Sequence, residues 1–184
     1  MAVALADAGV ELLQLRAKAH SSRDFLSLAR ATLDALASRD IPLVVNDRVD
    51  VALAAGAAGA HVGREDLPPG EARRLLGDEQ ILGVTAHDAV ELAEVDPAVA
   101  DYVGYGAVFG TKTRYGATIC GPEALTAAVA GTTLPVVAIG GIRPDNVEAL
   151  RGSGVAAVAA AGSLVPVRTS PGAVEEFLRL LRDW

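Results

Sequence analysis

The sequence is poor in cysteine, lysine and aromatic residues, and it contains no long apolar run. A single cysteine, Cys120, excludes a disulfide within the chain and a cysteine metal cluster, which suits a reducing compartment. No apolar segment reaches the ~20 residues of a membrane-spanning helix, and no basic stretch with an apolar run marks an export signal. We therefore expect a cytoplasmic protein with no membrane partner.

Positive charge is scarce. The chain has 16 Lys and Arg residues against 23 Asp and Glu, a formal net charge of −7, and only Lys18 and Lys112 are lysines. Binding to a nucleic-acid backbone depends on clustered basic residues, so this balance argues against a nucleic-acid partner. An anionic ligand would have to meet a local cluster of cations. The alanine- and arginine-rich composition fits a bacterial protein.

The hydrophobic content is sufficient for one sizeable core. The chain has 184 residues, 51% of them hydrophobic, so we expect residues 1–184 to form a single domain. Short apolar runs alternate with helix-like segments, which is the pattern of parallel βα units. The predicted strands are Glu11–Arg16, Pro42–Asn46, Ala60–Val62, Ile81–Val84, Tyr102–Gly106, Pro135–Ile139 and Ala156–Ala160.

Helix start signals precede several segments between these strands. Ser21 and Ser22 open the first long segment, and prolines stand near first-turn positions of four others. The predicted helices are the tail of a helix within Met1–Gly9, then Ser22–Ser38, Asp50–Ala55, Pro69–Leu76, Asp88–Leu92, Pro122–Val129, Pro144–Leu150 and Pro171–Arg182.

The predicted strands lack polar alternation, so both faces of their sheet should be covered, as in a barrel or a doubly wound sheet. Short spacing between units, and polar residues at almost every strand end, favour a TIM-type (β/α) barrel with its active site at those ends. A closed barrel needs eight strands, and seven are visible. We expect the first strand either upstream of Met1 in a longer reading frame or replaced by another closure.

Three polar side chains stand at alternating positions where the first predicted strand ends: Gln14, Arg16 and Lys18. In an extended chain all three point to one side. The planar fork of arginine and the compact charge of lysine together suit a pyrophosphate. The alternative is a solvated strand end with no ligand.

Acidic residues follow the next two predicted strands. Asn46 and Asp47 end one strand, and Asp66 lies four residues after the other. Mg²⁺ is usually held by one or two carboxylates with phosphates and water, so Asp47 and Asp66 are a candidate magnesium pair. Each carboxylate could instead cap the helix that follows it.

Glycine-rich turns follow the last two predicted strands. Gly140-Gly141 precedes the helix expected at Pro144, and Gly162-Ser163 follows the final strand, where barrels commonly bind a phosphate. Glycine there also permits positive φ without any ligand. The connection from Phe109 to Gly121 is long and rich in hydroxyl and cationic groups, as ligand-binding loops often are, although an ordinary mobile loop would look similar.

The three histidines carry less weight. His61 lies among apolar residues and reads as a hydrogen-bonded structural histidine. His87 is nearer the expected active-site mouth and is a lesser candidate for proton transfer. His20 is expected on the surface. No nucleophile–histidine arrangement or zinc pattern can be argued from these spacings.

Six motifs, in order and in register, resemble those of thiamine-phosphate synthase over essentially the whole chain. One such motif would be weak evidence, but six together are strong. The motifs are Gln14–Lys18, Val45–Leu53, His61–Pro68, Gly83–Thr85, Val108–Thr113 and Val137–Ile142.

The resemblance implies a magnesium-dependent transferase that joins hydroxymethylpyrimidine pyrophosphate to thiazole phosphate, giving thiamine phosphate and pyrophosphate. In that family the C–O bond is thought to break first, and the thiazole nitrogen captures the resulting cation. Such chemistry needs stabilisation of a leaving group, which agrees with a site of cations and metal without an activated nucleophile.

The resemblance also implies a role for each matching residue. Arg16, Lys18 and Asn46 would hold the pyrophosphate, Asp47 and Asp66 magnesium, Gln14 and Thr85 the pyrimidine, and Thr111, Thr113, Gly141, Gly162 and Ser163 the thiazole phosphate. Catalysis would rest on Arg16, Lys18, Asn46, Thr85 and Arg114.

Three positions depart from the family pattern. Thr85 stands where serine is common and keeps the hydroxyl. Arg114 replaces a lysine, so a planar fork takes the place of a point charge. Gly162 replaces a serine, with Ser163 adjacent.

Two other functions remain open. A thiazole tautomerase of the same superfamily would keep the barrel and the thiazole-phosphate site, and His87 is the residue that favours it. A non-catalytic thiazole-phosphate binding protein is motivated by the missing strand. A homo-oligomer is possible in each case.

Overall fold

The computed structural model describes residues 1–110, 118–162 and 172–181. The chain divides into two compact units, Met1–Val84 and Thr85–Trp184. Within each unit the strands are parallel and pair in chain order. The described residues form seven strands, in the α/β arrangement of a TIM-type barrel, as predicted.

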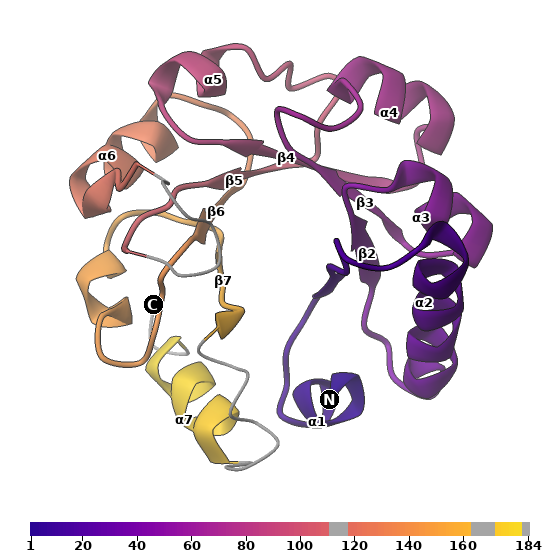
Figure 1. The fold of residues 1–184 in the computed structure, drawn as a ribbon. Helices are drawn as coiled ribbons and strands as arrows, with labels where there is room; N and C mark the ends of the chain where they lie inside the picture. The colour runs from indigo at the N-terminus through magenta and orange to yellow at the C-terminus, as the bar shows by residue number, and fades with distance from the viewer. Residues whose placement is uncertain (111–117, 163–171, 182–184) are drawn as a thin grey trace. The chain divides into compact units, whose positions relative to one another are not determined.

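The first unit alternates strands and helices from its first residues. Its strands β1 to β4 pair with Leu13 opposite Leu43, Asn46 opposite His61 and Val62 opposite Val84. Helices α2, α3 and α4 lie along one face of β2 and β3 (Figure 1). The elements are α1 (Ala2–Asp7), β1 (Leu13–Leu15), α2 (Ser22–Leu36), β2 (Leu43–Asn46), α3 (Val49–Ala55), β3 (Gly59–Val62), α4 (Pro69–Leu76) and β4 (Ile81–Ala86), which continues into the second unit.

Strands β2 and β3 are buried along their whole length, which confirms the reading of their continuous apolar sequence. Gly59 is required where β3 meets β4, because a Cβ there would lie 1.9 Å from the carbonyl oxygen of Ile81. Helix α2 begins as its sequence predicts, since the Ser21 hydroxyl accepts a hydrogen bond from the Asp24 amide.

The second unit has its own core, which includes Val103, Leu125, Leu150 and Phe177. Its strands β5, β6 and β7 pair in register, with Tyr105 opposite Ala138. The elements after β4 are α5 (Ala89–Ala93), β5 (Tyr102–Tyr105), α6 (Gly121–Ala130), β6 (Val136–Ile139), the 3₁₀ helix η1 (Val147–Leu150), β7 (Ala157–Ala159) and α7 (Gly172–Leu181).

Two sequence predictions about element bounds are wrong. The first strand ends at Leu15, so Lys18 lies in a turn beyond it and extended alternation does not place its side chain. The α-helix expected over Pro144–Leu150 is a turn followed by the four-residue helix η1. The helix expected before the first strand is present as α1.

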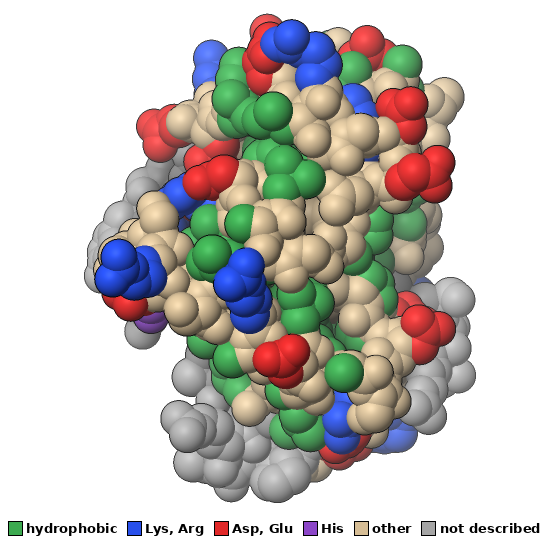
Figure 2. Space-filling view, turned by 90° about the vertical axis from the view of Figure 1, so that its right-hand side faces the viewer, with side chains coloured by type: hydrophobic (Ala, Val, Ile, Leu, Met, Phe, Trp, Pro, Cys, Tyr) green, Lys and Arg blue, Asp and Glu red, His purple; other side chains and the backbone are tan. Residues whose placement is uncertain are grey.

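Charges of both signs are interspersed on the face drawn in Figure 2, and neither sign gathers there into a continuous patch. Among the described helices, none is long and apolar enough to cross a membrane.

Candidate functional site

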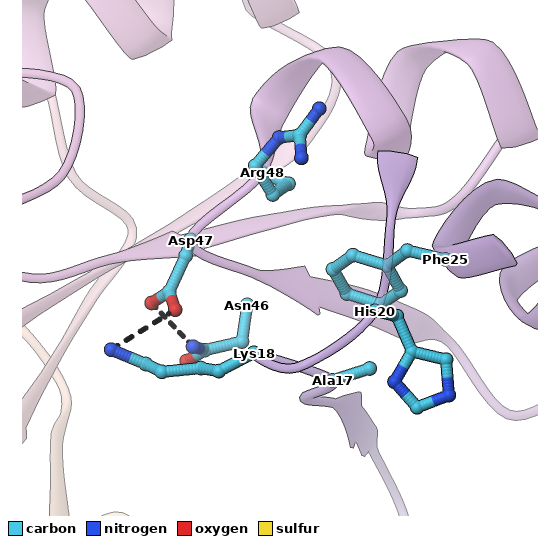
Figure 3. A pocket seen from close by; sticks show the side chains of 7 residues that line it. All are labelled: Ala17, Lys18, His20, Phe25, Asn46, Asp47 and Arg48. Carbon is cyan, nitrogen blue, oxygen red and sulfur yellow. Dashed lines mark hydrogen bonds and ion pairs between the residues drawn. The ribbon is translucent and has the colours of Figure 1, made fainter. Parts of the chain in front are cut away.

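A pocket of about 200 Å³ opens where β1 and β2 of the first unit end (Figure 3). Its walls come from the connection after β1, from the start of α2 and from the connection after β2. Two of the predicted pyrophosphate residues, Lys18 and Asn46, and one predicted metal ligand, Asp47, line it together. The other lining residues are Ala17, His20, Phe25 and Arg48.

The backbone at Asp47 adopts a conformation that is rare for a residue with a side chain. Its φ is +67°, in the left-handed region. The Arg48 amide donates to the Asn46 carbonyl at 2.9 Å, which closes a three-residue turn around Asp47, and the Asp47 amide donates to the His61 carbonyl at 2.8 Å. Such conformations cost about 1–3 kcal/mol and concentrate at functional sites. The turn directs the carboxylate into the pocket.

The Asp47 carboxylate has two polar partners in the pocket. The Lys18 ammonium lies 3.3 Å from Oδ2, and the Asn46 side-chain amide donates to Oδ1 (Figure 3). Asn46 is only 8% exposed, so its amide is held rigidly, whereas the Lys18 side chain is 55% exposed. The pocket therefore brings together a carboxylate bound by a buried amide and an exposed ammonium, which a turn after β1 places there.

Asp66 belongs to the connection after β3, where its carboxylate accepts a hydrogen bond from the Gly63 amide at 2.7 Å. The pKa of this carboxyl is raised, first by burial and further by hydrogen bonding to and repulsion from Asp47. Asp47 and Asp66 are thus close enough to interact. Neither α3 nor α4 has a side-chain cap, so the alternative that these residues are helix caps is wrong.

Two neighbouring carboxylates of this kind suit a hard divalent cation. Mg²⁺ accepts one or two carboxylates and completes its shell with phosphate oxygens and water. Within the described ranges, no group of three or more His, Cys, Asp and Glu gathers as a fully protein-built metal site would require. The donor set of Asp47 and Asp66 therefore fits magnesium held jointly with a phosphorylated ligand.

Arg48 was not selected as a site residue by sequence reasoning. Its Nε donates to Asp50 Oδ1 at 2.7 Å, its Nη2 donates to Oδ2 of the same carboxylate, and Nη2 also reaches Ser22 Oγ at 3.0 Å. Hydrogen bonding to Arg48 lowers the pKa of Asp50. The sequence signal that could have identified Arg48 is the motif Asn46–Asp50, in which Arg48 and Asp50 follow Asp47 closely.

Four candidates do not line this pocket: Asp66, Gln14, Arg16 and Thr85. Gln14 lies on β1 opposite Val44 and is exposed, and Arg16 is exposed just beyond the strand end. Thr85 is half-buried on β4 and belongs to the second unit. Their roles toward a pyrimidine or a pyrophosphate stay predictions.

The histidines divide as expected between buried and exposed positions. His61 is 6% exposed on β3, and burial lowers the pKa of its imidazole to about 4, which fits a structural residue. His20 is exposed and edges the pocket. His87 follows β4, and its Nδ1 and backbone amide both meet Glu91 Oε2, at 2.7 and 2.9 Å. Glu91 thereby fixes the orientation of the His87 ring.

The glycine pair after β6 packs closely on backbone of the second unit. A Cβ on Gly140 would lie 2.6 Å from Ala107, and one on Gly141 would lie 2.5 Å from the Gly110 carbonyl. Both residues also have positive φ. Sequence reasoning missed Asn146, whose Nδ2 donates to the Gly141 carbonyl at 2.9 Å. Packing therefore suffices to explain these glycines.

Most of the predicted thiazole-phosphate site lies outside the described residues. Thr111, Thr113 and Ser163 fall there, together with Lys112 and the predicted catalytic residue Arg114. Gly162 is described and is exposed after β7.

Known proteins resemble this chain over most of its length. The family model described as thiamine monophosphate synthase matches residues 1–164. The thiamine-phosphate synthase of Ruminiclostridium cellulolyticum is 37% identical over 172 residues, covering 94% of this chain and 82% of that protein. That of Enterococcus faecalis is 39% identical over 172 residues, covering 94% and 81%.

Solved structures show the same relationship. Thiamine phosphate pyrophosphorylase from Pyrococcus furiosus superposes with a TM-score of 0.88 at 31% identity, covering 99% of this chain and 88% of that one. 3-Hexulose-6-phosphate synthase shares the fold alone, with a TM-score of 0.70 at 18% identity over 97% of this chain and 92% of that one. The family model covers most of the chain, and the relatives named here are above 30% identical to it, so the chain belongs to the thiamine monophosphate synthase family.

Proposed function

We propose that this chain, as a thiamine-phosphate synthase, couples hydroxymethylpyrimidine pyrophosphate with thiazole phosphate and releases pyrophosphate, using Mg²⁺ in the cytoplasm. Family membership supports the overall reaction. The observation that carries the mechanism is the Lys18–Asp47–Asn46 arrangement, in which a cation and a fixed carboxylate meet at one strand-end pocket.

The reaction, as the resemblance implies it, begins with cleavage of the C–O bond between the pyrimidine methylene and the pyrophosphate. The electron pair leaves with the pyrophosphate, and the thiazole nitrogen then forms the new C–N bond to the methylene carbon. The first step creates negative charge on the leaving group, so catalysis requires donors fixed where that charge develops. No proton transfer to a strong base is needed before bond cleavage.

The residues of the pocket supply such donors. More than half of the Lys18 side chain is exposed, so its ammonium has room to turn from Asp47 to a phosphate oxygen. Asn46 is buried and points its amide at the same place, so it orients Asp47 and any group bound beside it. Arg16 would add a planar fork from the neighbouring strand end.

Magnesium, held by Asp47 and Asp66, would neutralise charge on the pyrophosphate. Burial is the main cause of the raised pKa of Asp66, and repulsion from Asp47 adds to it. A divalent cation held by the two carboxylates would relieve that repulsion, which supports this assignment. The strained turn at Asp47 and the hydrogen bond from the Gly63 amide to Asp66 support these roles.

The test is release of pyrophosphate by the purified chain with Mg²⁺ and both substrates, with each substrate alone as control. Release only when both are present is the expected result. Isomerisation of the thiazole without coupling would assign the chain to the tautomerases, with His87 and Glu91 as the pair to examine. Calorimetric binding of thiazole phosphate without any turnover would instead indicate a binding protein.

A further inference from the structure

Arg48 connects the starts of two helices in the first unit. Its guanidinium forms a two-point contact with Asp50, in the first turn of α3, and Nη2 also donates to Ser22 Oγ at 3.0 Å. Ser22 is the first residue of α2, and the connection before it carries Lys18. One side chain thus joins the two connections that line the pocket.

The strained turn at Asp47 needs support at both of its ends. Asn46 ends β2 and is paired with His61 in the sheet, so the first end is fixed by the strand ladder. The second end is Arg48, the residue before α3, which has no side-chain cap of its own. Strained backbone persists only where the surroundings over-determine it. The contacts from Arg48 to Asp50 and Ser22 supply that restraint.

The Arg48 side chain points away from the Asp47 carboxylate and does not contact it. Figure 3 shows the guanidinium extending away from the carboxylate, which points to Lys18 and Asn46 instead. Arg48 can therefore affect a ligand of Asp47 only indirectly. It does so by holding the backbone of the turn and the distance between the connections that carry Lys18 and Asp47.

We propose that Arg48 is a positioning residue, whose bridge from Asp50 to Ser22 holds Asp47 in its left-handed turn and keeps the Lys18 connection beside it for a divalent cation and a pyrophosphate group. The inference rests on the proposed function for the identity of the ligand. The dependence of the Asp47 turn on the Arg48 contacts with Asp50 and Ser22 is independent of that ligand.

Two substitutions separate the parts of the bridge. Arg48→Lys keeps the charge but cannot make the planar two-point contact and reach Ser22 at once. Ser22→Ala removes only the contact to α2 and puts a good helix former in its place, so folding is not at risk. Arg39→Lys is the matched control, because Arg39 also joins two segments, bonding to Asp7 at 2.8 Å, and its side chain is 28% exposed against 35% for Arg48.

The experiment is a titration of each protein with Mn²⁺ in the presence of inorganic pyrophosphate, followed by electron paramagnetic resonance, with thermal unfolding measured alongside. We expect Arg48→Lys to weaken Mn²⁺ binding about tenfold, which corresponds to about 1.4 kcal/mol, and Ser22→Ala to weaken it about threefold. Arg39→Lys should leave the affinity within twofold of the unmodified chain.

Equal affinity in Arg48→Lys and the unmodified chain would overturn the proposal, and so would an equal loss in Arg39→Lys, because general loosening would then explain the effect. The titration needs no turnover. If the unmodified chain binds Mn²⁺ with pyrophosphate but releases no pyrophosphate from its substrates, the proposed function is wrong. The binding affinities of the variants would still test the role of Arg48.

Discussion

The Lys18 ammonium lies 3.3 Å from Oδ2 of Asp47, although the two residues come from connections after different strands. Only the parallel pairing of β1 with β2 brings these connections to one edge of the sheet. The pair is partly solvated, so it contributes little to stability. Under the proposed function, the two groups would bind ligands of opposite charge: a phosphate for Lys18 and a metal ion for Asp47.

Replacing Lys18 should therefore affect activity far more than stability. In Lys18→Ala, we expect the rate of pyrophosphate release to fall by about 100-fold or more, because a donor to the leaving group is lost. The free energy of unfolding should change by less than about 1 kcal/mol. Steady-state kinetics and urea denaturation would measure both. Arg74→Ala, which removes an exposed arginine paired with Glu71, is the control and should keep full activity; a comparable loss there would contradict the assignment.

Asp66→Asn should make the metal-free protein more stable at neutral pH. Since the pKa of Asp66 is raised in the folded state, its contribution to stability is present at low pH and is lost as the pH rises through the folded pKa. Asparagine cannot ionise and can still accept from Gly63. The gain should be below about 1 kcal/mol because the carboxylate is partly solvated.

The same variant should lose the rise in melting temperature that Mg²⁺ with pyrophosphate gives the unmodified chain, since a ligand stabilises only the form that binds it. Thermal unfolding with and without both additions checks the two expectations. A variant that is less stable without metal, or still stabilised by it, would argue against the shared carboxylate site.

The left-handed turn at Asp47 predicts a difference between two substitutions that both remove its charge. Asparagine tolerates positive φ better than alanine, so Asp47→Asn should be more stable than Asp47→Ala by about 1 kcal/mol. Both should lose metal-dependent coupling. Chemical denaturation of the two variants measures the difference. If the alanine variant equals or exceeds the asparagine variant in stability, strain at this residue is not significant.

Buried His61 predicts a loss of stability in acid. Its pKa falls from 6.5 to about 4 on folding, so the unfolded chain binds the proton more readily in that range. The contribution of neutral His61 to the free energy of unfolding is complete above pH 6.5 and is lost as the pH falls toward 4. The loss amounts to about 3 kcal/mol at 1.36 kcal/mol per pH unit. Denaturation curves between pH 7 and 4 should show a shallower loss in His61→Gln than in the unmodified chain. His20→Gln, at an exposed position, should keep the steep dependence, and identical slopes in all three proteins would refute the role of His61.

The strands and most helix starts followed from local patterns in the sequence. Continuous apolar runs such as Leu43–Val45 have one stable arrangement, buried on both faces of a parallel sheet, and Ser21 caps α2 through a contact three residues away. Candidate site residues after the early strands could be chosen from the sequence for a similar reason. Polar residues placed after successive parallel strands gather at one edge, so Asn46 and Asp47 could be chosen before their neighbours were known.

What only the tertiary structure decided were contacts between connections and the backbone angles that they enforce. The sequence does not encode in any local pattern that Asp47 has positive φ, that Arg48 reaches Ser22 across 26 positions, or that a turn and not an extended strand places Lys18. Nor could it show that the glycines after β6 are needed for packing on Ala107 and Gly110. Composition and periodicity determined the class of fold and the chemistry available at the strand ends, because both depend on near neighbours. The geometry that makes a site of those residues depends on segments far apart in the chain, and so it emerged only from the folded structure.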